Sequence, residues 1–180
     1  LRKFKAAGPR RQVLALLEKR IFLQGGCRYV MANSQLVKNQ IMNYYGVSSS
    51  KIEVIYNSVD TGRFSTKNRE LLGKETRARH GIDENARIIF FVGNDFRRKG
   101  LSILLKGVAG LGGEDVMVLV AGGDRTTLYE RMAKDLGIEK KVGFLGPIEK
   151  LESYYSASDL FVLPTRYDAF ANVCLEAMAC

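Results

Sequence analysis

The sequence has few residues of the kinds that hold zinc or form disulfide frameworks. Its 180 residues include a single histidine, His80, and three cysteines, none of which lies in a C-x-x-C pair. Structural zinc sites draw their four ligands mainly from these two residue types, so no metal site is expected. An odd number of unpaired cysteines also suits a reducing compartment, and we expect the protein to be cytoplasmic.

Long apolar runs are missing as well. The longest are too short to cross a bilayer, and the first residues lack the apolar stretch of a secretory signal. No internal repeat or low-complexity tract is present, and the composition is typical of a soluble globular protein. Leu1 and Cys180 both fall within helical-looking sequence that has no cap. We therefore expect the chain to be an internal fragment of a longer protein.

The positive charge is concentrated at the N-terminus. Residues 1–20 contain seven Lys or Arg and one Glu, so this segment accounts for +6 of the net charge of +9. Such a segment could be a solvated helix face, a contact with an anionic membrane surface, or an arm that binds nucleic acid. No aromatic interleaving or RNA-binding signature accompanies it, which weakens the last alternative. We expect no nucleic-acid partner, and we keep peripheral binding to the inner face of the plasma membrane through residues 1–20 as a hypothesis.

Predicted strands and helices alternate along the chain. The predicted strands are 27–34, 51–57, 87–92, 115–121, 141–145 and 159–163, and the predicted helices are 10–24, 35–46, 66–81, 99–109, 125–136, 148–157 and 170–179. This alternation across short loops predicts an α/β protein with Rossmann-like, doubly wound parallel sheets. A boundary is expected near residues 58–66, so that 1–60 would form the end of one domain with its linker. Residues 61–180 would then form most of a second domain, truncated at its C-terminus.

The loops that follow the strands are the places to look for a site, because open parallel sheets bind ligands at the carboxyl ends of their strands. The loop "GNDFRRKG" (93–100) has Gly93, which allows close backbone approach, and the cations Arg98 and Lys99 beside the predicted start of a helix. A helix N-terminus favours an anion, so this loop could hold a phosphate. A solvated basic corner explains the loop equally well. The chain has neither the G-x-G-x-x-G fingerprint nor a P-loop.

Two further loops contain glycine turns. "VAGGDRT" (120–126) is best explained as a tight connection between a strand and a helix. "VGFLGPI" (142–148) places Leu145 and Gly146 at a strand end, where a flat ring could lie on the backbone.

The fourth loop carries two acids. Asp168 precedes a predicted helix, and Glu176 follows eight residues later within that helix. Eight residues rotate a helix by about 80° net, so both carboxylates could face one cavity, and the first helical amides suit a phosphate. Alternatively, Asp168 caps the helix and Glu176 is a surface charge. Leu175 and Ala177 flank Glu176, which favours a buried carboxylate with a partner.

Taken in order and spacing, segments of residues 27–180 resemble retaining glycosyltransferases of family 4, which have the GT-B fold. The segments are "VMANSQLVKNQI", "VIYNSVDTGRF", "FFVGNDFRRKG", "LVAGGD", "KVGFLGPIEKLESYYSASDLFVLPTRYDAF" and "NVCLEAMAC". The most specific is the family's E-x7-E motif, present as Asp168-x7-Glu176. The loop 93–100 and the basic leading helix look closest to the lipopolysaccharide-core glucosyltransferases.

The resemblance implies a role for each of these residues. Arg98 and Lys99 would neutralise the donor diphosphate, Asp168 would hold hydroxyls of the transferred sugar, and Glu176 would hold the ribose hydroxyls. Backbone contacts with the donor are implied for Gly93, Asn94, Leu145, Gly146, Phe170, Ala171, Asn172 and Val173. The chain contains no D-x-D triplet, which agrees with catalysis without a metal or other cofactor.

Two positions depart from the family pattern. The first motif acid is usually Glu, and Asp168 has a shorter reach. Many members have Arg where this chain has Asn94, which leaves the positive charge to Arg98 and Lys99.

The implied function is transfer of a hexose, glucose, from a UDP-linked sugar to a glycan or lipopolysaccharide-core acceptor, with retention. In this fold the acceptor site lies mostly in sequence that would precede Leu1, so we expect the fragment alone to have little or no activity while still binding nucleotide. A basic nucleic-acid module remains an alternative and predicts salt-dependent binding. Another GT-B enzyme, such as an epimerase or phosphorylase, would require other signatures, which are absent from the sequence.

Overall fold

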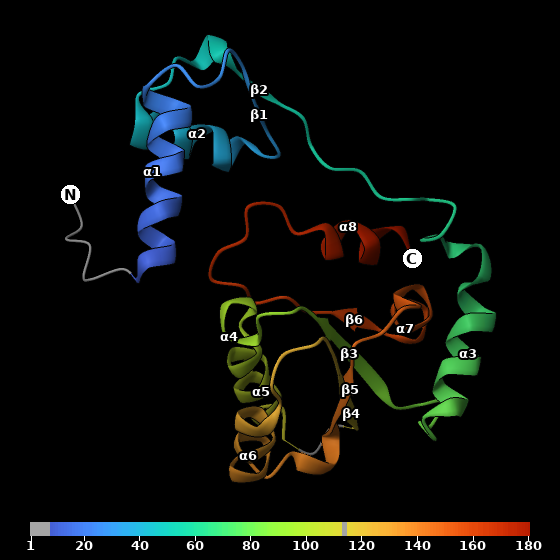
Figure 1. Cartoon of the computed structure of the whole chain (residues 1–180). Coiled ribbons are helices and arrows are strands. Elements are labelled where there is room, and N and C mark those ends of the chain that lie inside the picture. The colour runs from blue at the N-terminus through green and yellow to red at the C-terminus, as the bar shows by residue number, and fades with distance from the viewer. Residues whose placement is uncertain (1–7, 113–114) are drawn as a thin grey trace. The chain divides into compact units, whose positions relative to one another are not determined.

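The computed structural model of the chain describes residues 8–112 and 115–180, which form two compact units (Figure 1). The division between them falls after Asn57. All strand pairs within the described residues are parallel, and each unit contains helices, so the predicted α/β class is confirmed.

The first unit is small. It consists of α1 (Pro9–Leu23), β1 (Val30–Ala32), α2 (Gln35–Tyr45), the 3-10 turn η1 (Ser49–Lys51) and β2 (Ile52–Val54). The two strands are much shorter than predicted, because only three residue pairs join their ladder. Helix α2 begins where the sequence indicates, since the Ser34 side chain accepts a hydrogen bond from the Val37 amide. It ends at Gly46, whose φ of 65° suits glycine.

Helix α1 contacts the core of the first unit through Phe22, which stacks on Tyr45 with ring centroids 4.8 Å apart. The remaining residues of its predicted apolar stripe, Val13, Leu14, Leu16, Leu17 and Ile21, are at least 43% exposed. Arg10, Lys19 and Arg20 are also exposed, whereas the other cations of the basic segment lie outside the residues whose side chains are described. Among the described residues, no helix is long and apolar enough to cross a membrane.

The second unit is built on a four-stranded sheet. Its strands are β3 (Arg87–Val92), β4 (Val116–Ala121), β5 (Val142–Gly146) and β6 (Leu160–Phe161), in the order β5-β4-β3-β6. Its helices are η2 (Thr66–Asn68), α3 (Arg69–Arg79), α4 (Phe96–Lys99), α5 (Leu101–Ala109), α6 (Thr127–Asp135), η3 (Glu139–Lys141), α7 (Leu151–Ala157) and α8 (Asn172–Ala179). Strand β3 has the predicted bounds, whereas β6 is only two residues long because it pairs with β3 at two positions.

Both faces of this sheet are covered. Ile89 and Phe91 of β3 pack in a cluster with residues of α5 and α6, and Phe90 packs on the opposite face with Tyr154 and Tyr155 of α7. Figure 1 shows α5 and α6 on one side of the strands and α3 and α7 on the other. Alternate residues of β3 thus pack into two different hydrophobic cores, one on each face of the sheet, as a doubly wound sheet requires.

The order of the strands determines where a ligand crevice can form. From β3 the chain moves outward to β4 and β5, and then returns to β6 on the other side of β3. The loop after β3 leads to α4 and α5, and the loop after β6 leads to α8, which packs on the opposite face. Such a reversal opens a crevice at the carboxyl ends of the two strands. The loops at this point are 93–95 and 162–171.

Candidate functional site

The loop after β3 ends in a single helical turn, α4. Asp95 precedes this turn, and its carboxylate accepts a hydrogen bond of 3.0 Å from the Arg98 amide. The helix predicted over 99–109 begins at Leu101 instead, as α5. Lys99 ends the separate turn α4, and Gly100 lies between the two helices. Arg98 and Lys99 lie in the last turn of α4, where positive charge is favourable. They also directly precede α5, whose N-cap is Gly100 and whose first residue is Leu101, so their predicted place before a helix start is confirmed, and their binding of a phosphate stays a prediction.

Arg98 fastens this loop to the loop after β6. Its guanidinium lies 3.2 Å from Asp95 and donates to the Tyr167 carbonyl oxygen at 3.3 Å. Its own carbonyl oxygen accepts hydrogen bonds from the Arg166 amide and the Thr165 hydroxyl, both at 3.1 Å. The hydrogen bond from the Arg98 amide, followed by the Arg98 charge, holds the pKa of Asp95 below its ordinary value.

Lys99 and Asp168, predicted as separate parts of one site, form an ion pair. Their side chains are only 13% and 14% exposed, and the second Asp168 oxygen accepts a hydrogen bond from the Phe170 amide. Gly93 makes room for the lysine, because a Cβ there would lie 2.9 Å from the Cγ of Lys99. The alternative in which Asp168 caps the helix is not supported, since α8 begins at Asn172 without a side-chain cap.

Gly100 allows the two loops to touch through their backbones. Its φ is 85°, and a side chain there would overlap the carbonyl oxygen of Pro164. Gly100 was not predicted as a site residue, because the predicted helix 99–109 ran through it. A glycine between a cation cluster and an apolar helix was the available signal.

The loops after β4 and β5 adjoin the first loop. Gly122 donates to the Gly146 carbonyl oxygen at 2.8 Å, which joins the second predicted loop to the third. The Asn94 side chain accepts a hydrogen bond of 3.2 Å from the Gly123 amide, so it acts as a strut between loops. Asp124, which sequence analysis also missed, accepts from the Phe96 amide at 2.9 Å. Its partner, Phe96, lies 28 residues earlier, so no local spacing in the sequence indicated this contact.

The remaining predicted backbone contacts lie on the same edge. Leu145 packs partly against the core beneath β5, and it ends that strand together with Gly146. Before α8, the Phe170 amide donates to Asp168, and the Asn172 amide donates to the Phe170 carbonyl oxygen at 3.1 Å. These two amides are thus engaged within the loop. Ala171 and Val173 flank Asn172 at the first turn of α8.

Glu176 is half-buried in α8 and accepts a hydrogen bond of 2.9 Å from the hydroxyl of Tyr155 in α7. The interpretation of Glu176 as a surface charge is therefore wrong, and the expected partner is present. Tyr155 was not identified from the sequence, because its hydroxyl meets a residue of a different helix 21 positions later.

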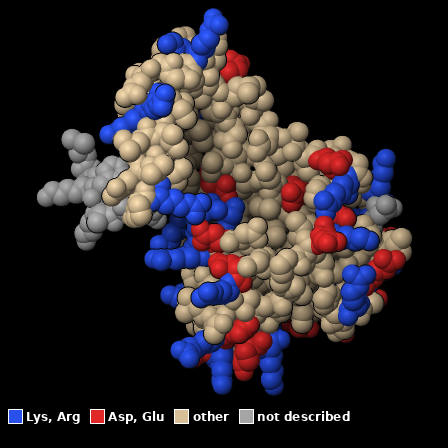
Figure 2. Space-filling view, in the orientation of Figure 1, with Lys and Arg blue, Asp and Glu red and all other residues tan. Residues whose placement is uncertain are grey.

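The charged surface of the molecule is mixed on the face that Figure 2 draws. Figure 2 shows Lys and Arg interspersed with Asp and Glu over the visible surface. Arg97, the third cation of the loop 93–100, is exposed. The described residues, 8–112 and 115–180, include no group of three or more His, Cys, Asp or Glu side chains arranged to hold a metal ion.

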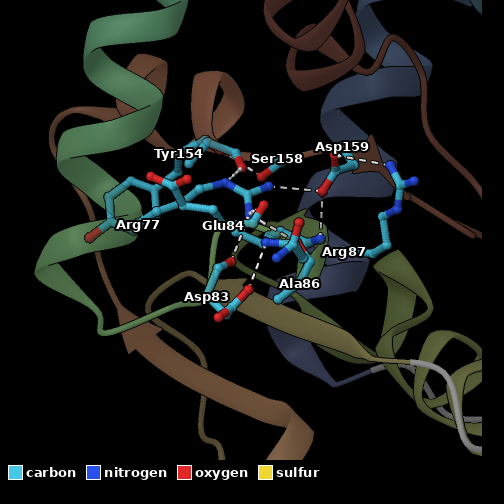
Figure 3. A network of polar contacts seen from close by, with 11 residues as sticks. Arg77, Asp83, Glu84, Ala86, Arg87, Tyr154, Ser158 and Asp159 are labelled. Carbon is cyan, nitrogen blue, oxygen red and sulfur yellow. Dashed lines mark hydrogen bonds and ion pairs between the residues drawn. The ribbon is translucent and has the colours of Figure 1, made fainter.

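A cavity of the second unit lies away from these loops. Its volume is about 900 Å³, and it lies between α3 and the residues around Asp159, at the amino ends of β3 and β6. Beside it, Arg77 donates to the carbonyl oxygens of Ala157 and Ala86 and to the Asp159 carboxylate, as part of the network in Figure 3. Asp159 also accepts from the Ile88 amide. These groups satisfy one another, so we assign this network to stability rather than to a ligand site.

The second unit is a doubly wound α/β domain in which a cation and an acid meet between two loops at the carboxyl edge of the sheet. The glycosyl transferases group 1 family matches residues 73–180, and glycosyltransferase family 4 matches residues 2–63. The chain belongs to the glycosyl transferases group 1 family.

Several known proteins are similar to it. D-inositol 3-phosphate glycosyltransferases of Corynebacterium kroppenstedtii and Mycolicibacterium smegmatis are 31% and 32% identical over 83% and 84% of this chain. The chain spans 36% and 35% of their lengths. Among solved structures, WaaG, a glycosyltransferase involved in lipopolysaccharide biosynthesis, shares the fold with a TM-score of 0.84 at 23% identity, over 95% of this chain and 47% of WaaG. Anabaena HepE in complex with UDP-glucose has a TM-score of 0.77 at 24% identity, over 86% of this chain and 43% of HepE.

Proposed function

We propose that the protein containing this chain transfers glucose from UDP-glucose to an acceptor hydroxyl, with retention and without a metal ion. The contact between Lys99 and Asp168 carries this proposal. In a nucleotide sugar, the transferred sugar is bonded directly to the distal phosphate. A cation for the diphosphate and an acid for the sugar must therefore be neighbours, as these two side chains are.

Lys99 has enough donors for both tasks. An ammonium group carries three N–H donors, so Lys99 can keep Asp168 and still bind a phosphate oxygen. Arg98 adds a second positive charge on the same turn. When the bond between the sugar C1 and the diphosphate breaks, negative charge develops on the leaving phosphate, and fixed cations stabilise that charge. No metal is required for this step.

Glu176 would receive the other end of the donor. It lies eight residues beyond Asp168 and one helix turn inside α8, so the diphosphate would lie between the sugar and the ribose. A carboxylate accepts hydrogen bonds from vicinal hydroxyls, which suits the ribose. The Leu145–Gly146 strand end would support the base, and the amides around Ala171 and Val173 would contact the distal phosphate.

The acceptor is proposed to be a glycan, such as a lipopolysaccharide core. The glycosyltransferase WaaG, which shares the fold, supports this acceptor by its involvement in lipopolysaccharide biosynthesis. The names of the D-inositol 3-phosphate glycosyltransferases favour a second candidate, a polyol phosphate. Residues 1–20 would hold the enzyme at an anionic membrane surface when the acceptor is lipid-linked.

The donor proposal is tested by thermal unfolding of the chain with UDP, GDP and ADP. UDP is expected to raise the midpoint temperature through binding to the folded state, and EDTA is expected to leave that rise unchanged. Replacing Lys99 by Met removes a charge-assisted hydrogen bond and should weaken UDP binding by about tenfold or more. Arg97→Met is the matched control, because Arg97 is an exposed cation two residues away. Equal losses in both variants, or no shift with any nucleotide, would contradict the proposal.

A further inference from the structure

We propose that Tyr155 is a positioning residue that orients Glu176 for the donor ribose. This inference rests on the proposed function, in which Glu176 binds the ribose hydroxyls. Its geometric basis is the hydrogen bond of 2.9 Å from the Tyr155 hydroxyl to Glu176 Oε2. The bond connects α7 to α8, and it constrains a side chain that would otherwise choose among several rotamers.

The ring of Tyr155 is held firmly. It makes edge-on contacts with Phe64, Phe90 and Phe161, with centroid distances of 6.1, 5.2 and 5.5 Å. Only 5% of Tyr155 is exposed. Edge-to-face aromatic packing at these distances favours one ring orientation. The hydroxyl is therefore directed at Glu176 by its surroundings.

The hydroxyl also stays protonated. Burial, and then the nearby negative charge of Glu176, raise the pKa of Tyr155 above its ordinary value of 10.0. Tyr155 is thus a hydrogen-bond donor throughout the physiological pH range. Because a carboxylate accepts about four hydrogen bonds, one from Tyr155 leaves capacity for two ribose hydroxyls.

Helix α7 is held by side-chain hydrogen bonds near both of its ends. The helix that carries the Tyr155 hydroxyl is therefore fixed in position. Near its start, Glu152 accepts a hydrogen bond of 2.9 Å from Arg63. At its end, the Ala157 carbonyl oxygen accepts from Arg77 at 3.0 Å. A binding group works best when the residues that orient it are themselves fixed by packing and hydrogen bonds.

The test compares Tyr155→Phe with Tyr154→Phe in the full chain. Both changes remove one buried hydroxyl from α7, but the Tyr154 hydroxyl bonds to His80 at 3.0 Å rather than to Glu176. The probes are UDP and 2′,3′-dideoxy-UDP, which lacks both ribose hydroxyls. Affinities are measured by calorimetry, and thermal unfolding without ligand verifies that each variant is folded.

Tyr155→Phe is expected to weaken UDP binding by about three- to tenfold, because Glu176 loses the hydrogen bond that orients it for the ribose while its own contacts with the ribose can still form. It should leave the affinity for 2′,3′-dideoxy-UDP unchanged, and Tyr154→Phe should affect neither probe. In the Glu176→Gln background, Tyr155→Phe should add little, because the two residues act through one contact.

The measurements distinguish failure of the proposed function from failure of the role proposed for Tyr155. If UDP does not bind the unmodified chain, the proposed function fails and this inference fails with it. If UDP binds and Glu176→Gln weakens it but Tyr155→Phe does not, the donor site stands and the role of Tyr155 is refuted. Equal weakening of both probes by Tyr155→Phe would also refute it, since that result indicates a general structural effect.

Discussion

At the scale of single residues, the candidate site depends on glycines as much as on charged groups. Gly93 leaves space for the stem of Lys99, and Gly100 lets the chain pass against Pro164. The two loops meet only because neither glycine carries a Cβ. Two residues without side chains thus allow the cation and the acid that define the site to meet.

Gly100→Ala should destabilise the second unit by about 2–4 kcal/mol, through left-handed backbone strain together with overlap at Pro164. Gly137→Ala is the matched control, since Gly137 has a φ of 69° but no atom lies within 4 Å of the place that a Cβ would take. It should cost only about 1 kcal/mol, the strain alone. Urea denaturation measures both free energies of unfolding. Equal losses would show that the contact with Pro164 contributes nothing.

At the scale of helices and strands, Arg77 holds four segments together. It extends from α3 to the end of α7, to the residues before β3, and to Asp159 before β6 (Figure 3). The carbonyl groups at a helix end need partners, and Arg77 supplies one for α7. This helix carries Tyr155, so the network supports the site from the opposite end of the sheet.

Arg77→Met should lower the free energy of unfolding by about 2–4 kcal/mol, because it leaves the carbonyl oxygens of Ala86 and Ala157 without this donor and removes the ion pair between Arg77 and the exposed Asp159. Arg79→Met, an exposed change on the same helix, should stay within about 0.5 kcal/mol. Chemical denaturation measures both variants. A loss in Arg77→Met no greater than in Arg79→Met would mean that solvent replaces these contacts.

The sequence predicted the buried elements best. Strand β3 has its predicted bounds because its continuous apolar run is buried on both faces, and α2 carries its own start and stop signals in Ser34 and Gly46. The turn α4 was missed because it is only four residues long, and because one of its two stabilising contacts, with Asp124, joins residues 28 positions apart; the other, the Asp95 cap, is local. For the same reason, the partner of Glu176 could be expected but Tyr155 could not be named.

At the scale of the whole molecule, the described residues include the proposed donor site but not the proposed acceptor site. The proposed nucleotide-binding edge belongs to the second unit, whereas the acceptor side is proposed to lie in sequence outside this chain. The aligned part of the chain covers only 36% and 35% of the lengths of the two D-inositol 3-phosphate glycosyltransferases. Binding and turnover should therefore separate experimentally.

The 180-residue chain should bind UDP but release little or no UDP from UDP-glucose, because the residues beneath the sugar are proposed to lie elsewhere. Chromatography of the nucleotide products measures turnover, and the UDP-dependent thermal shift serves as the control for a folded site. Steady release of UDP at rates typical of enzymes, about 1 per second or more, would contradict this prediction.

The backbone contact between Gly100 and Pro164 has a consequence for the thermodynamics of recognition. The two loops are already tied together without a ligand, through Arg98, Thr165 and Arg166 as well as this contact. The conformational entropy of ordering them is therefore lost during folding rather than during association. A nucleotide-sugar donor would bind loops that are already ordered. Its binding free energy would then reflect the new contacts, with little cost for ordering the loops.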